Sequence, residues 1–212
     1  MSIIKKRISP FLALWLLVIS ISVCIAVVLA GPLGEFLHNL REVTPSATDD
    51  GDYEFLISAL FLVGLFMGFG QWIVIRNKIK ITKSWIFATT IGFSIGGLVS
   101  FQFLYFLVQY DYNFYMFYGT ILIGGTFIGA GIFMGFFQWL SLKRKLAGSF
   151  LWSLVNGLSF LIGLLPMLLP SYFMDISFFI SIGLVALTNG YFVEKFVIRP
   201  EIEIFSQKEN AI

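Results

Sequence analysis

The sequence predicts an all-α integral membrane protein, built as a six-helix transmembrane bundle with an internal parallel repeat. Three observations lead there: an apolar composition, charges confined between long apolar runs, and a nine-residue motif that occurs twice. Of the 212 residues, 58% are hydrophobic and 12% are charged, with a mean hydropathy of +0.90. A soluble domain carries about 25% charged residues. We therefore treat residues 1–212 as a single membrane domain.

Six apolar runs are long enough for a helix to cross the hydrocarbon core, which takes about 20 residues. Lipid offers no hydrogen-bond partners, so a backbone that spans it must satisfy its own polar groups, and each run should be a helix. The predicted spans are 11–33, 55–75, 85–109, 117–142, 150–170 and 176–198.

The first span has a second interpretation. The basic run Lys5-Lys6-Arg7, an apolar stretch and then Val28-Leu29-Ala30 together resemble a signal peptide with its cleavage site. The apolar stretch is about 20 residues, longer than the usual 7–15 of such a peptide. We expect a retained helix. Cleavage would leave five spans and a new N-terminus outside.

The charges between the spans predict the orientation. With the N-terminus in the cytoplasm, 13 of the 14 Lys and Arg residues lie inside and only Arg41 lies outside. Eight of the 12 acidic residues then fall outside. Because cytoplasmic loops carry the excess of basic residues, both termini are predicted to be cytoplasmic.

Aromatic residues give the same orientation independently. Tryptophans flank the two basic loops, whereas most tyrosines fall at the opposite face. Amphipathic rings prefer the headgroup level of a membrane. We therefore expect four interface anchors, namely Trp72, Trp85, Trp139 and Trp152.

The repeated motif is the most specific feature of the chain. Gly64–Trp72 and Gly131–Trp139 are identical at seven of nine positions, 67 residues apart. In each copy two glycines and a glutamine fall at i, i+4 and i+7, on one helix face. They are Gly64, Gly68 and Gln71, and then Gly131, Gly135 and Gln138. Each repeat unit, 55–109 or 117–170, holds two spans, so the copies share one orientation.

Glycines on a membrane helix allow close backbone approach, and a glutamine on the same face can bond across the contact. The motif therefore predicts helix packing. The alternative is a polar site between helices, lined by Gln71 and Gln138. Both lie near the cytoplasmic end rather than the midplane, which favours packing. Asn156 and Asn189 are costly to expose to lipid, so we expect both to face the bundle interior and bond between helices.

The repeat extends beyond the motif. The third and fifth spans begin with Trp85 and Trp152, and Trp15 lies early in the first span. Thr188-Asn189-Gly190 stands in the last span where a degenerate third motif would fall. These features predict three helical hairpins around a pseudo-threefold axis.

The pattern GxxxGxxQWxxL followed by Lys or Arg resembles that of a set of uncharacterised bacterial multi-span membrane proteins that carry it two or more times. The resemblance covers residues 64–76 and 131–144. It implies a multi-pass protein of a bacterial plasma membrane and carries no activity.

The sequence holds little that points to catalysis or to a cofactor. Gly92-Phe-Ser-Ile-Gly96 matches the GxSxG pattern but lies inside a span. We expect Ser94 to bond back to its own helix. His38 is the only histidine, and Cys24 is the only cysteine and is expected to face lipid or protein. The acidic run Asp49–Asp52 lacks EF-hand spacing, so a solvated loop is favoured over a calcium site.

These features favour a non-catalytic accessory or structural subunit of a membrane complex. The alternative is a small-solute binding or transport protein. Its outer aromatic stretch Tyr110–Tyr115 would then close over the solute, although an interfacial aromatic belt explains that stretch equally well. We expect no enzyme activity, no metal and no cofactor.

The expected partners are the lipid bilayer and a membrane protein or a second copy. The net charge of +2 is too small to suggest nucleic acid. Transport needs a cavity bordered by polar groups, whereas packing needs those groups bonded to one another.

Overall fold

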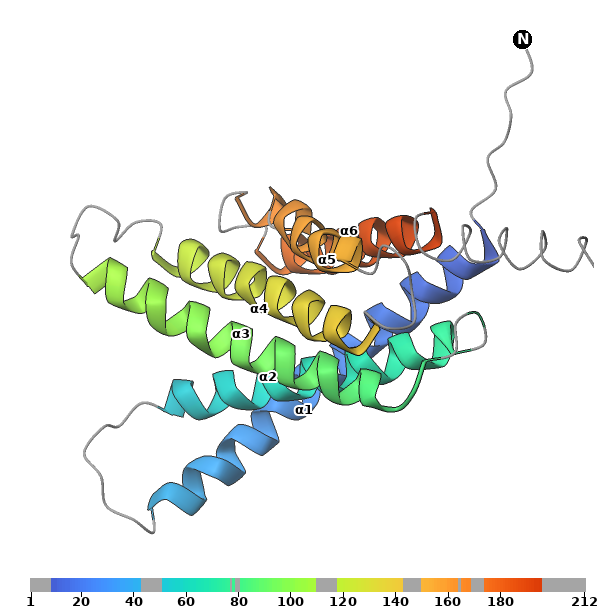
Figure 1. Cartoon of the computed structure of the whole chain (residues 1–212). Helices are drawn as coiled ribbons and strands as arrows, with labels where there is room; N and C mark the ends of the chain where they lie inside the picture. Colours follow the sequence, from blue (N-terminus) through green and yellow to red (C-terminus); the bar gives the residue numbers. More distant parts are fainter. Residues whose placement is uncertain are drawn as a thin grey trace, which may run out of the picture.

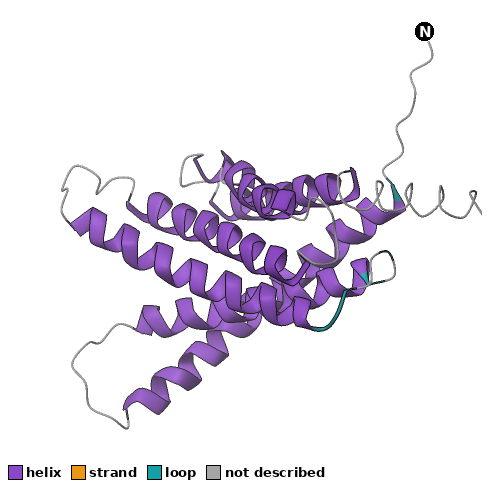
Figure 2. Cartoon of the chain, in the orientation of Figure 1, coloured by secondary structure: helices purple, strands orange, loops and turns teal. Residues whose placement is uncertain are grey.

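The computed structural model is helical throughout its described residues, with no strand among them (Figure 2). The described residues are 9–42, 51–76, 78, 81–109, 118–142, 150–163, 165–168 and 174–195. The α-helices are α1 (Pro10–Glu42), α2 (Gly51–Ile75), α3 (Ser84–Gln109), α4 (Tyr118–Leu142), α5 (Phe150–Gly163) and α6 (Met174–Val193). A short 3-10 helix, η2 (Leu165–Leu168), follows α5.

The six described α-helices form a closed ring. Each packs against the next along the chain, and α6 packs against α1. Successive helices run in opposite directions, so α2, α4 and α6 end where α1, α3 and α5 begin (Figure 1). We call this side of the bundle the glutamine end, because Gln71 and Gln138 lie there.

Ser9 immediately precedes α1, and its hydroxyl contacts both α1 and the end of α6. Its hydroxyl oxygen accepts a hydrogen bond from the Leu12 N–H at 3.1 Å, which caps the first turn. The same hydroxyl donates to Oε2 of Glu194 at 2.5 Å. The start of α1 and the end of α6 therefore meet at the glutamine end.

The helix α1 ends later, and α5 ends earlier, than the apolar runs of the sequence predict. The helix α1 runs on past residue 33 to Glu42, through Pro32. Beyond that proline Gly34 packs closely on α2, where an added Cβ would lie 3.0 Å from the Phe55 Cα. The helix α5 ends at Gly163 rather than at 170. Pro166 has no N–H for a continuing helix and its ring clashes with the preceding turn, so the chain tightens into η2.

Four helices are long and apolar enough to cross a membrane. Their apolar segments are Pro10–Leu40, Glu54–Ile75, Ser84–Leu107 and Gly124–Leu142. The described apolar stretches of α5 and α6 are shorter, at Leu151–Gly163 and Phe179–Val193. The structure thus fits a helical membrane protein with four candidate transmembrane helices.

The outside of the bundle is apolar and part of its inside is polar. Every fourth residue of α3 forms an exposed hydrophobic stripe, namely Phe87, Ile91, Ile95, Val99 and Phe103. Buried polar side chains include Ser58, Gln71, Thr89, Thr126, Gln138, Asn156, Ser159 and Asn189. Such a continuous apolar face suits hydrocarbon and not water.

The first helix contributes to the core along its length. Trp15, Ala26 and Ala30 of α1 are fully buried. Cleavage after Ala30 would remove all three from the bundle. Cys24 lies on the exposed side of the same helix, as a free thiol.

Candidate functional site

The two repeated glutamines meet in the interior of the bundle. Nε2 of Gln138, on α4, donates to Oε1 of Gln71, on α2, at 2.8 Å. Gln138 is 0% exposed and Gln71 is 2% exposed. A contact between residues 67 positions apart thus joins equivalent points of the two motif copies.

Gln138 is the centre of the hydrogen-bond pattern. Its Nε2 also donates to Oγ1 of Thr89 at 2.7 Å. Its Oε1 accepts from Nε1 of Trp152 at 2.5 Å and from Nδ2 of Asn156 at 3.1 Å. One side chain of α4 therefore bonds to α2, α3 and α5 at once.

The pattern continues into α6. Nδ2 of Asn189 donates to Oδ1 of Asn156 at 2.7 Å. Asn156 in turn donates to the carbonyl oxygen of Trp152 at 2.9 Å. We call the bonded set the amide network. Its members are Gln71, Trp85, Thr89, Gln138, Trp152, Asn156 and Asn189.

The indole groups fix the direction of this network. An indole N–H can only donate, so the amide atom that faces it must be oxygen. Trp152 therefore orients Gln138, and Trp85, whose Nε1 lies 3.3 Å from Oε1 of Gln71, orients Gln71. The nitrogens then point onward, and the amides run as donors from Asn189 through Asn156 and Gln138 to Gln71.

The repeated glycines bring the helices close enough for these bonds. A Cβ added at Gly68 would lie 2.8 Å from Cβ of Thr89 on α3, and one at Gly64 would lie 3.0 Å from Cα of Thr90. At Gly135 it would lie 2.7 Å from Cα of Ser153 on α5. Real Cβ atoms essentially never lie closer than 3.0 Å to another atom, so a side chain at Gly68 or Gly135 would force its neighbour to shift, and one at Gly64 would be tighter than most real contacts.

The second motif repeats this arrangement at its other glycine. An added Cβ at Gly131 would lie 2.4 Å from Cδ2 of Phe160, also on α5. The first copy of the motif therefore packs on α3 and the second copy packs on α5.

The structure revises the role of two tryptophans. Trp85 and Trp152 are each 1% exposed, and their rings meet edge-on at 4.9 Å between centroids. They are partners of the glutamines inside the bundle and do not face headgroups. An indole N–H that is buried away from water needs a hydrogen-bond acceptor. The side-chain oxygens of the two glutamines supply it.

The other two tryptophans are half-buried. Trp72 lies beneath the guanidinium of Arg76, 4.7 Å from the ring centroid. Trp139 packs on Phe136 at 5.6 Å between centroids. Both keep surface available to a headgroup layer.

The sequence analysis does not identify Thr89 as a partner of Gln138. It also does not pair Trp85 and Trp152 with the glutamines. The signal for both is the repeat interval. Thr89 and Asn156 are separated by the same 67 residues as the glutamines. Each glutamine precedes its tryptophan partner by 14 residues. Extending the alignment past the motif into the next span reveals both.

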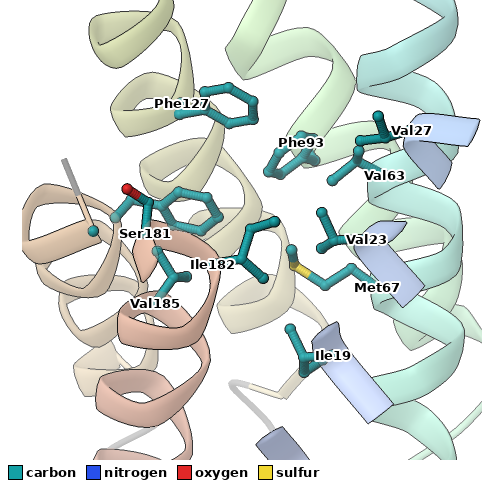
Figure 3. Close-up of a pocket in the computed structure, with 12 residues that line it drawn as sticks. Ile19, Val23, Val27, Val63, Met67, Phe93, Phe127, Ser181, Ile182 and Val185 are labelled. Carbon is teal, nitrogen blue, oxygen red and sulfur yellow. The ribbon is translucent and has the colours of Figure 1, made fainter. Parts of the chain in front are cut away.

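A cavity of about 70 Å³ lies between the helices of the bundle (Figure 3). Each helix supplies one of these lining residues: Val23, Met67, Phe93, Phe127, Phe160 and Val185. Val23, Phe93 and Phe160 stand eight residues after Trp15, Trp85 and Trp152, about 12 Å along a helix. The hydroxyl of Ser181, also in the lining, donates to the Ser177 carbonyl oxygen at 2.7 Å. The cavity therefore presents an apolar wall.

The described residues offer no candidate metal centre. They contain no group of three or more His, Cys, Asp or Glu side chains that could hold a metal ion. The expected back-bond of Ser94 is wrong, because its buried Oγ has no hydrogen-bond partner in the described part of the chain. Asp49 and Asp50 of the acidic run, and the whole aromatic stretch 110–115, lie outside the described residues.

No protein-family model, curated protein or solved structure matches this chain. Its function is therefore argued from its own geometry.

Proposed function

We propose that this chain is a non-catalytic, multi-pass membrane protein that serves as an accessory or structural subunit of a membrane complex. One observation carries the proposal. The polar side chains that a solute would need are bonded to one another across α2, α3, α4, α5 and α6. Buried amides used in this way hold helices together.

The cavity supports the same choice over solute transport. A binding site for a polar solute needs polar groups from several helices at its wall. The 70 Å³ cavity is bordered by aliphatic and aromatic side chains, and Ser181 is turned toward its own helix. A small polar solute would lose its hydration there and gain no hydrogen bond.

We further propose that all six helices cross the bilayer. The helix α5 carries its own exposed stripe of leucines, Leu151, Leu154, Leu158 and Leu161, and exposed Leu165 follows in η2. Its 14 residues and the four of η2 would extend about 29 Å at the rises of the two helix types, close to the hydrocarbon thickness of about 30 Å. The antiparallel ring also places α5 and α6 between helices that are long enough to span.

The pseudo-threefold arrangement is part of the proposal. Two even-numbered helices each present an amide to a tryptophan of the next helix: Gln71 to Trp85 and Gln138 to Trp152. The third such place is Asn189 on α6 facing α1, where Trp15 is fully buried. This relation closes the ring and supports an internal parallel repeat.

We predict that a cysteine at position 78 reacts only from the cytoplasmic side. Lys78 is exposed beside the glutamine end, and the Ser9–Glu194 bond places the first and last helix ends there too. The test compares labelling of Lys78→Cys, in a Cys24→Ala background, by an impermeant thiol reagent in spheroplasts and in inside-out vesicles. Labelling in spheroplasts would contradict the proposed orientation.

Native mass spectrometry of the protein, gently extracted from its own membrane, tests the role itself. We expect a stoichiometric second polypeptide. A bound small solute that is lost from a folded Gln71→Leu/Gln138→Leu double variant would instead establish solute binding. A bare monomer or homo-oligomer would reject the subunit role.

A further inference from the structure

We propose that one buried water molecule joins Trp15 to Asn189 and completes the third tryptophan–amide contact of the bundle. In this structure Nε1 of Trp15 and Oδ1 of Asn189 are buried and have no hydrogen-bond partner among the described residues. The two residues are 0% and 4% exposed. One atom is a donor and the other is an acceptor, so a single bridging molecule satisfies both.

The direction of the amide network determines which atom of Asn189 is free. Its Nδ2 donates to Oδ1 of Asn156, whose own Nδ2 is committed to Gln138. Turning the Asn189 amide over would set two oxygens against each other. Oδ1 of Asn189 is therefore the acceptor that remains at the start of the network.

Packing places the indole of Trp15 against the neighbouring residue of Asn189. An added Cβ at Gly190 would lie 2.5 Å from Cδ1 of Trp15. Cδ1 is the ring atom bonded to Nε1, so the donor edge of the indole faces the last turns of α6. In the other two tryptophan–amide pairs the same edge reaches a glutamine oxygen directly.

Side-chain length explains why this third pair stays open. Asparagine has one methylene fewer than glutamine, about 1.5 Å of reach. Trp15 and Asn189 both line a small void of about 10 Å³, together with Gln71 and Asn156. That volume corresponds to about one water molecule, and its wall offers the polar partners that a buried water needs.

The chemistry of the two atoms selects the ligand. An indole N–H repels a cation, and a carbonyl oxygen repels an anion. The occupant must accept one hydrogen bond and donate another, and it has room for about one heavy atom. Water meets these conditions.

The test is magnetisation transfer between water and the indole protons of ¹⁵N-tryptophan-labelled protein in detergent micelles. Rotating-frame spectra separate true contacts from proton exchange, and single Trp→Phe variants assign the five indole signals. We expect a water contact at Trp15 and none at Trp85 and Trp152, which serve as internal controls. Absence of the Trp15 contact in the wild-type protein would overturn the proposal.

Asn189→Gln provides the matched variant. The longer side chain should displace the water and accept the indole N–H directly. The water contact of Trp15 is then lost, while its indole proton keeps a hydrogen-bonded chemical shift and the Trp85 and Trp152 signals stay unchanged. A water contact that persists in the folded variant would show that Asn189 does not hold the molecule and would overturn the assignment.

Discussion

Replacing Gln138 with methionine is expected to cause the largest loss of stability of any substitution in the amide network, about 2–4 kcal/mol. Methionine has a similar volume and shape, so the change removes hydrogen bonds with little loss of packing. Four hydrogen bonds end at this side chain, from or to Gln71, Thr89, Trp152 and Asn156. Their common loss would remove the hydrogen bonds from this side chain to α2, α3 and α5.

The size of the effect follows from which groups keep a partner. Asn156 still donates to the Trp152 carbonyl, and Gln71 still accepts from Trp85. The Trp152 N–H is left buried without an acceptor among the described residues, and one such group costs about 1–3 kcal/mol. Each of the other interhelical hydrogen bonds of Gln138 that is lost costs a further ~0.6 kcal/mol, and about 2 kcal/mol at most.

Gln71→Met is the matched comparison from the other copy of the motif. It removes a long bond of 3.3 Å from Trp85 and the 2.8 Å bond from Gln138, whose Nε2 still reaches Thr89. The Trp85 N–H also loses its acceptor, but that bond is longer than the one to Trp152 and fewer bonds are lost in total, so we expect a smaller loss than at Gln138, about 1–3 kcal/mol. Reversible unfolding in mixed micelles, followed by tryptophan fluorescence, measures both. Equal losses, or none, would mean that Gln138 is not the centre of the network.

Gln102→Met controls for the general cost of the substitution. Gln102 lies on the exposed side of α3, away from the buried amides. We expect a smaller loss than at Gln138, because this side chain is exposed. The difference between positions 138 and 102 then compares a buried amide of the network with an exposed amide.

The sequence predicts the helices of this fold well and their partners poorly. Apolar runs mark helices because lipid permits few alternatives, and the i, i+4, i+7 spacing of Gly64, Gly68 and Gln71 correctly gathers them on one face. That spacing does not say which helix they contact. The partner depends on the order of helices around the ring, which is a tertiary property that no single segment encodes.

Trp85 and Trp152 show the limit most clearly. A tryptophan next to a basic loop is typical of a membrane interface, and both occur beside one. Their depth along the helix is compatible with that role, but their rotation about the helix axis is not. Both tryptophans lie on the buried faces of α3 and α5, the helices that the glycines of α2 and α4 approach closely. Local sequence around a tryptophan carries no information about that rotation.

Gly135→Ala is expected to reduce stability by about 1–3 kcal/mol, as overpacking does in well-packed cores. The new Cβ would lie 2.7 Å from Cα and 3.0 Å from the carbonyl oxygen of Ser153. These are backbone atoms, so no side-chain rotation relieves the contact and α5 must move away from α4. That movement would carry Trp152 and Asn156 away from Gln138.

The distinguishing control is Gly183→Ala on α6, where an added Cβ meets nothing within 4 Å. Alanine favours the helix over glycine by about 1 kcal/mol, so this variant should be as stable as the wild type or slightly more so. If close approach at Gly135 serves the hydrogen bonds, Gly135→Ala should have a much smaller effect in a Gln138→Met background, because the bonds it disturbs are already absent. Additive losses would mean that the glycine contact and the amide network stabilise the bundle independently.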